Sequence, residues 1–190
     1  APMTVTVFPL SPAISGILWL FLLHPSFGLV SIFINKWFGA NWNPVLNGRD
    51  AMVMIILASS WKQISYNFVF FIAGMQAIPK SLIEAAAIDG ASPFRRFWKI
   101  TLPLLSPTMF FLTVMNIIFA FFEPFGVIHT VTQGGPGGST NILVYKVYQD
   151  GFVGLDLGSS SAQSVLLMSL IILITVLQFR YVEKKVQYTA

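Results

Sequence analysis

A row of polar side chains interrupts a strongly apolar stretch between residues 51 and 77. Ser59, Lys62, Gln63 and Tyr66 recur at the i, i+3, i+4 and i+7 spacing and therefore share one face of a helix. A cation at the centre of a membrane-spanning helix costs about 2.5–3.5 kcal/mol on insertion scales, so Lys62 must face protein, water or a ligand. Two interpretations stay open: either the ammonium binds a ligand, or it snorkels or pairs with an acid for structural reasons alone.

A second polar stripe lies in a later apolar stretch. Asn116 and Glu123 are seven residues apart, with Ala120 between them, and so share a helix face. We expect this stripe to face the first one. For Glu123 an alternative stays open, because Pro124 follows it and the carboxylate would then simply mark the outer membrane boundary.

Metal and nucleotide chemistry have little support in this sequence. There is no cysteine, and the two histidines, His24 and His129, are too far apart to suggest a metal cluster. A glycine cluster at 134–138 precedes Ser139 and Thr140, but no lysine precedes that hydroxyl pair, so the G-K-[ST] requirement of a P-loop fails. We therefore expect this chain to bind no ATP, cofactor or metal, and to be a non-enzymatic subunit.

The composition indicates an all-α, polytopic transmembrane bundle that has lipid as a neighbour. Hydrophobic residues make up 55% of the 190 positions and charged residues only 9%, against about 25% charged in soluble domains. No basic stripe with interleaved aromatic residues is present, which argues against nucleic acid as a partner.

Four spans are predicted, each long enough to cross about 30 Å of hydrocarbon at about 1.5 Å per residue. Pro9 and Pro12 should kink the first span, and residues 29–38 should form a short amphipathic helix at the outer interface. Residues 129–158 are predicted to form an outer loop. The four spans cover residues 5–23, 51–77, 104–125 and 160–179.

The loop between the second and third spans, residues 78–103, is the main polar interruption. Its net charge of +2 predicts a cytoplasmic location. Together with the tail after the last span, it places seven Lys or Arg residues inside against three outside. The inner cations are Lys80, Arg95, Arg96, Lys99, Arg180, Lys184 and Lys185, and the outer ones are Lys36, Arg49 and Lys146.

Within this loop the sequence predicts a short helix over residues 82–88. Ser81 is the expected N-cap, with Glu84 three residues later completing a capping box, and Gly90 is expected to end the helix. Three consecutive alanines at 85–87 would let another protein approach the backbone closely, and Pro93 should turn the chain before residues 94–100. We interpret the loop as a docking element; the alternative is an ordinary basic loop in which Glu84 is only a cap.

The loop resembles the cytoplasmic loop of permease subunits of binding-protein-dependent ABC importers. That resemblance implies a coupling helix that inserts into a cleft on a separate ATP-hydrolysing subunit, with Glu84 and Arg95 or Arg96 holding the docking geometry. The shared spacing is E-A-A-x3-G-x9-I-x-L-P, provided here by Glu84, Ala85, Ala86, Gly90, Ile100, Leu102 and Pro103.

The resemblance extends over nearly all 190 residues and implies the type I permease core of an ABC importer in the bacterial inner membrane. The segments WKQISYN, SLIEAAAIDGA and YKVYQDGFVGLDLGSSSAQSV are similar to importers of sn-glycerol-3-phosphate or glycerophosphodiesters. The resemblance implies that the chain forms half of a translocation pathway that works by alternating access. The implied partners are a second permease, two copies of an ATP-binding subunit that holds ATP and Mg²⁺, and a periplasmic binding protein. Such permeases have more spans than four, so we expect further spans N-terminal to this sequence.

By position, the resemblance places Ser59, Gln63, Tyr66, Asn116, Ala120 and Glu123 in the transmembrane substrate pathway. Lys62 is hypothesised to offer its charge to a phosphate, for which Glu123 is an awkward neighbour. Three alternatives remain: a permease for a neutral sugar or polyol, an ion-coupled carrier that uses a Lys62–Glu123 pair, and a membrane scaffold without transport.

Overall fold

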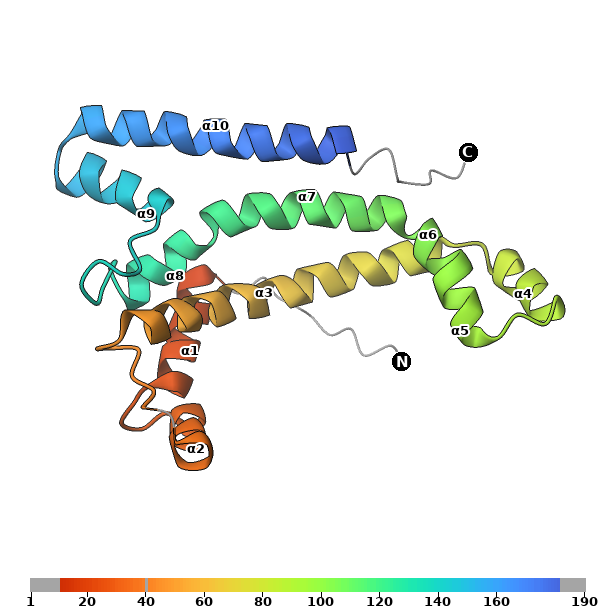
Figure 1. Ribbon diagram of the computed structural model, residues 1–190, viewed down its shortest axis with the longest axis horizontal. Helices are drawn as coiled ribbons and strands as arrows, with labels where there is room; N and C mark the ends of the chain where they lie inside the picture. Colours follow the sequence, from red (N-terminus) through yellow and green to blue (C-terminus); the bar gives the residue numbers. More distant parts are fainter. Residues whose placement is uncertain (1–10, 40, 182–190) are drawn as a thin grey trace.

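The computed structural model describes residues 11–39 and 41–181, and all regular structure within those ranges is helical. Figure 1 shows three long helical runs side by side, with α7 between the other two. The runs are α3 (Gly48–Ala77), α7 (Ser106–Phe122) continued by α8 (Pro124–Val131), and α10 (Leu157–Tyr181).

The length and apolar composition of these runs suit a membrane. Among the described residues, Ser106–Val131 and Leu157–Tyr181 are each long and apolar enough to cross a bilayer, and α3 passes the same test together with α4 (Lys80–Ile88), from which it is bent by 66°. Only 17% of each of the first two runs is buried inside this chain. Lipid or other protein must therefore cover most of their apolar surface.

Local signals set the bounds of α3. Asn47 caps its start by accepting a hydrogen bond from the Arg49 backbone N–H at 3.0 Å, and Asp50 lies in the first turn, where a negative charge favours the helix dipole. The helix ends at Ala77 because Pro79 disfavours helical geometry in the preceding residue. The predicted end of this span is confirmed.

The third span extends further than predicted. We expected it to end at residue 125, but the helical run continues to Val131 with only a local break at Glu123. Pro124 is the first residue of α8, a position where its missing N–H is not needed, so it restarts a helix instead of ending one. Glu123 is thus followed by eight more helical residues and does not mark the end of the span.

The first predicted span is only partly described, since residues 5–10 lie outside the described ranges. Its described part, α1 (Pro12–Leu23), has 12 residues and runs across the long axis of the molecule, packing on α8 and α3 (Figure 1). Pro12 occupies the first turn, so the predicted kink at this residue is wrong. The predicted amphipathic helix is present as α2 (Leu29–Phe38).

The hydrophobic core sits at one end of the long helices, where α1, α3, α8 and α9 meet. Ile55, Ala58, Val127, Ile128 and Tyr145 form a buried cluster there. Near the opposite end α3 and α7 approach closely, because a Cβ at Gly74 would lie 2.7 Å from the Thr108 hydroxyl oxygen. The core cluster thus joins α3 to α8 and α9, and the contact between α3 and α7 continues beyond it.

Short elements occupy the two ends. At the end away from the core lie α4, α5 (Pro93–Arg96), a π-helical turn (Phe97–Thr101) and α6 (Leu102–Leu104). At the core end lie α9 (Leu143–Tyr148) and a second π-helical turn (Gln149–Val153). Figure 1 shows α10 ending on the same side as α4, so Arg180 and the basic loop share one side of the molecule, as the charge distribution predicts.

Candidate functional site: a polar groove and a projecting loop

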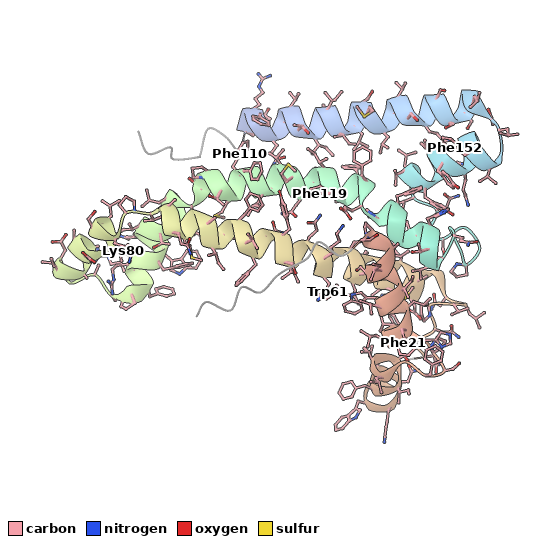
Figure 2. The ribbon with its side chains drawn as sticks, turned by 180° about the vertical axis from the view of Figure 1, so that it is seen from behind. Phe21, Trp61, Lys80, Phe110, Phe119 and Phe152 are labelled. Atoms are coloured by element: carbon pink, nitrogen blue, oxygen red, sulfur yellow. The ribbon has the colours of Figure 1, made fainter. Side chains whose placement is uncertain are left out.

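A polar groove of about 310 Å³ runs between α3 and α7, midway between the two ends. Its polar residues carry amide, hydroxyl or carboxylate groups, and Phe119 contributes an aromatic ring from α7 (Figure 2). The groove is lined by Ser59, Ser60, Gln63, Ile64, Asn67, Asn116, Phe119, Ala120, Glu123 and Pro124.

Five of the seven residues predicted for a substrate pathway line this groove: Ser59, Gln63, Asn116, Ala120 and Glu123. The other two, Lys62 and Tyr66, are not among the lining residues. Lys62 instead donates from Nζ to Glu123 Oε2 at 2.7 Å, and the Tyr66 ring packs against Phe70 and Phe119 with centroids 4.6 and 5.7 Å away. The expectation that the two polar stripes face each other is confirmed.

The groove-facing side of α3 is rotated slightly from the predicted one. Ser60 and Asn67 line the groove and were not assigned to it, although Asn67 lies four residues after Gln63 and so on the same helix face. Asn67 and Asn116 exchange two hydrogen bonds, at 3.1 and 2.8 Å. This amide pair joins α3 to α7, beside the Lys62–Glu123 ion pair.

The ion pair settles one open question about Lys62. Its side chain is 17% exposed and that of Glu123 is 23% exposed, so both charges are largely withdrawn from solvent and lie against each other. Pairing with an acid is therefore what Lys62 does in this structure. Among the described residues no group of three or more His, Cys, Asp or Glu is arranged to hold a metal ion.

The loop after α3 forms two short helices with a sharp turn between them. The first, α4, begins at Lys80 after Pro79 and has no side-chain cap, so the predicted Ser81–Glu84 capping box is wrong: Ser81 lies inside the helix. The predicted ending is confirmed, because Gly90 follows Asp89 with a φ of +75° that favours glycine. Ser92 caps α5 by accepting from the Arg95 backbone N–H, and Pro93 opens that helix.

The surface of this loop is open. Ile88, Phe94 and Trp98 are 87%, 74% and 52% exposed, and α4 and α5 contain no buried residue. Figure 2 shows Lys80 at one extreme of the molecule and Phe152 near the other, so the loop projects away from the core. Exposed apolar and aromatic side chains in such a position indicate a contact surface for another protein.

The residues predicted for coupling differ in how much they contribute to that surface. Glu84, Ala85 and Arg95 are exposed, whereas Ala86, Arg96 and Pro103 are half-buried. Glu84 forms no ion pair with any described residue of this chain, so its carboxylate is available to an external partner. The role of Glu84 and of Arg95 or Arg96 in holding the docking geometry stays a prediction.

The opposite end is tied together by polar contacts. The predicted outer loop begins later than expected, because His129 is still in α8. Asp150 accepts from Gln163 at 2.6 Å and Ser159 at 3.2 Å and pairs with Lys146, and the hydrogen bond from Gln163 is the main reason that the pKa of this carboxyl is lowered. Burial raises the pKa of Tyr145 in the adjacent α9. These contacts hold α9 against the start of α10.

The chain is similar to known transport proteins over nearly its whole length. Residues 4–188 match the family described as "Binding-protein-dependent transport system inner membrane component". The "sn-glycerol-3-phosphate transport system permease protein UgpA" of Rhizobium meliloti (strain 1021) is 58% identical over 97% of this chain and 64% of its own length. The protein of the same name from Escherichia coli O157:H7 is 56% identical over 95% of this chain and 61% of its own length.

Solved structures show the same fold at lower identity. A bacterial ABC transporter involved in the import of the acidic polysaccharide alginate matches with a TM-score of 0.80 at 21% identity, over 95% of this chain and 64% of that one. The bacterial alginate transporter in complex with a periplasmic protein bound to an alginate pentasaccharide matches with a TM-score of 0.81 at 20% identity, over 98% of this chain and 66% of that one. The chain thus spans about two thirds of the length of these proteins.

Proposed function

This chain belongs to the family of inner membrane components of binding-protein-dependent transport systems, and from that premise we propose that it forms part of one half of the translocation pathway of an ATP-driven importer. Membership makes it a multi-pass protein of the inner membrane. The loop of α4 and α5 is the proposed contact with an ATP-hydrolysing subunit, and the groove between α3 and α7 is the proposed substrate wall.

The proposed substrate is sn-glycerol-3-phosphate or a glycerophosphodiester. The single observation that carries this assignment is the 56–58% identity to permeases named for sn-glycerol-3-phosphate transport, over 95–97% of this chain. The polar lining of the groove suits a small hydroxylated substrate. Ser59, Lys62, Gln63, Tyr66, Asn116, Ala120 and Glu123 remain the residues proposed for this pathway.

Alternating access is the proposed mechanism, and the connectivity supports it. The loop at 78–103 joins the end of α3 to the start of α7, which are the same two helices that line the groove. A displacement of the loop by closure of an ATPase dimer would therefore act on both walls at once. ATP and Mg²⁺ would be held by that partner, and this chain would catalyse no reaction itself.

The proposed assembly contains a second permease, two copies of the ATP-binding subunit and a periplasmic binding protein. The solved alginate transporter in complex with a periplasmic protein supports the last of these. The apolar surface of α10, on which Val165, Leu166 and Leu173 are 59–65% exposed, leaves ample area for lipid or a second permease.

The test is uptake by the full-length complex in proteoliposomes, with ATP inside and binding protein outside. We expect accumulation of labelled sn-glycerol-3-phosphate that requires both ATP and the binding protein. Accumulation driven by a proton or sodium gradient without ATP would indicate an ion-coupled carrier, and the absence of any accumulation would favour a scaffold.

A permease for a neutral sugar or polyol is the second candidate, and one observation favours it. The polar groups lining the groove are neutral except for Glu123, whose charge is compensated by Lys62. Competition separates the two: an excess of unlabelled glycerol or maltose should leave uptake of sn-glycerol-3-phosphate unchanged, whereas a neutral-substrate permease would transport those compounds instead.

A further inference from the structure

The Lys62–Glu123 pair is placed asymmetrically with respect to the groove. The carboxylate of Glu123 lines the groove, whereas Lys62 is absent from the lining and contacts Oε2 of that carboxylate at 2.7 Å. Oε1 of Glu123 has no hydrogen-bond partner among the described residues. Glu123 therefore brings to the groove a carboxylate of which one oxygen, Oε1, is still free to accept a hydrogen bond, while the ammonium is held at the other oxygen.

The neutral polar groups around Glu123 still have unused hydrogen-bonding capacity. Gln63 and Ser60 make no side-chain hydrogen bond to the described residues, and the Ser59 hydroxyl oxygen is shielded from solvent without a partner. Asn67 and Asn116 each use one amide N–H on the other, which leaves a second N–H on each. No residue lining the groove is cationic.

An ionised carboxylate only accepts hydrogen bonds, so its natural partner is a hydroxyl donor. A phosphate monoester at neutral pH carries a charge of about −1.5 to −2 and presents mainly acceptor oxygens, for which the carboxylate has no proton to donate. We infer that Glu123, with Lys62 as its counter-ion, binds the hydroxyl end of a glycerol-type substrate, and that the phosphate end points away from this carboxylate. This inference rests on the proposed function.

The assignment changes the role of Lys62. The sequence suggests that Lys62 binds a phosphate, but the geometry makes it the counter-ion that holds the Glu123 carboxylate in place from outside the groove, at 2.7 Å. Lys62 is thereby a positioning residue, and Glu123 is the group that distinguishes a hydroxyl from a methyl at the same place on the substrate.

The test pairs a change in the protein with a change in the substrate. Uptake of sn-glycerol-3-phosphate is compared with uptake of the matching enantiomer of propane-1,2-diol 1-phosphate, which keeps the phosphate and lacks the terminal hydroxyl. Both are measured in proteoliposomes that contain the full-length complex, ATP and the same binding protein. Because the binding protein is common to all variants, its own selectivity cancels in the ratio.

The unmodified complex should prefer the hydroxylated compound at least tenfold, and Glu123→Gln should reduce that preference by about tenfold. Asp50→Asn is the matched control, since it removes one carboxylate charge from the first turn of α3 without changing a residue that lines the groove, and the preference should be unchanged. Lys62→Met/Glu123→Gln leaves no unpaired charge, so it should assemble and show the same reduced preference as Glu123→Gln.

Three outcomes overturn the inference. The first is an unchanged hydroxyl preference in both variants while the unmodified complex still transports. The second is an equal loss of uptake of both phosphorylated compounds by the double variant, which would indicate that Lys62 binds the phosphate. The third is failure of the double variant to assemble, which would make the pair purely structural. No uptake of either compound by the unmodified complex would refute the proposed function itself, and the inference with it.

Discussion

The core end of this chain, where α1, α3, α8 and α9 meet, buries apolar side chains, whereas the loop end, formed by α4 and α5, exposes them. At the core end, Ile55, Ala58 and Ile128 are at most 2% exposed, and a network around Asp150 ties α9 to α10. At the loop end, α4 and α5 bury nothing, and Ile88 and Phe94 are among the most exposed apolar side chains of the described residues. The core end has a buried hydrophobic cluster of its own, although Phe152 there is still 77% exposed, whereas α4 and α5 at the loop end contain no buried residue and leave their apolar side chains for other molecules to cover.

The largest effect on function is expected from a change in the turn between the two loop helices, α4 and α5. Gly90 has a φ of +75°, and a Cβ there would meet nothing within 4 Å, so the constraint is conformational and not steric. Gly90→Val should strain this turn by about 1–3 kcal/mol and should strongly reduce ATP-coupled uptake, because the two loop helices would no longer keep their relative orientation. Insertion and ATP hydrolysis by the complex should persist.

Gly90→Asn is the matched control, because asparagine tolerates a left-handed backbone far better than valine does. It should retain most of the uptake, which is measured beside ATP hydrolysis in the same proteoliposomes. Normal uptake by Gly90→Val would show that this turn does not transmit force.

Replacing one alanine by leucine at each end tests directly whether the two ends differ in packing. Ala58 is 0% exposed, so Ala58→Leu should overpack the core and cost about 1–3 kcal/mol, seen as a lower melting temperature of the detergent-solubilised complex. Ala85 is exposed, so Ala85→Leu should leave the melting temperature of the permease nearly unchanged.

The two variants should separate in function as well. Ala85→Leu adds bulk to the proposed docking face and should lower binding of the ATPase subunit in a pull-down assay, whereas Ala58→Leu should not alter binding by the fraction that remains folded. Equal melting temperatures for the two variants would contradict the contrast between the ends.

A smaller effect is expected midway between the ends. The Asn67–Asn116 pair joins α3 to α7, and hydrogen bonds between membrane helices contribute about 0.6 kcal/mol on average and at most about 1.7. Asn67→Ala and Asn116→Ala should each destabilise the complex by that order, and the double variant should cost less than the sum. Full additivity in thermal unfolding would mean that the two amides are not coupled.

The smallest effect concerns acid stability at the core end. The folded-state pKa of Asp150 is lowered, mainly by the hydrogen bond from Gln163, so its contribution to stability is present above its ordinary pKa of 3.8 and is lost as pH falls through the lowered value. Gln163→Leu should move the acid-induced loss of stability to higher pH, measured as melting temperature across an acid titration. Glu84→Gln, at the loop end, should leave that profile as it is.

Helix positions were largely predictable because local signals determine them. Gly28 and Gly39 flank α2, and Pro79 ends α3, so their bounds follow from turn and capping chemistry. Pro124 misled the prediction because a proline that ends one helix and a proline that begins the next have the same sequence signature.

The groove was predictable in outline but not in detail. The spacing of Ser59, Gln63 and Glu123 placed them on facing stripes, because helical periodicity is a local property. Which residue at the edge of a stripe faces the groove depends on the rotation of α3 against α7, and this is set by tertiary packing. That rotation brings Asn67 into the lining and leaves Lys62 behind Glu123.

The 66° elbow between α3 and α4 makes α4 a lever about 13 Å long, at about 1.5 Å per residue for its nine residues. Ile78, at the elbow, is only 8% exposed, so the joint is packed against its surroundings and does not swing freely. A push on the tip of this arm is therefore passed on as torque that tilts α3 as a stiff rod. A small displacement of α4 can in this way reach the groove between α3 and α7 without any side chain in between having to relay it.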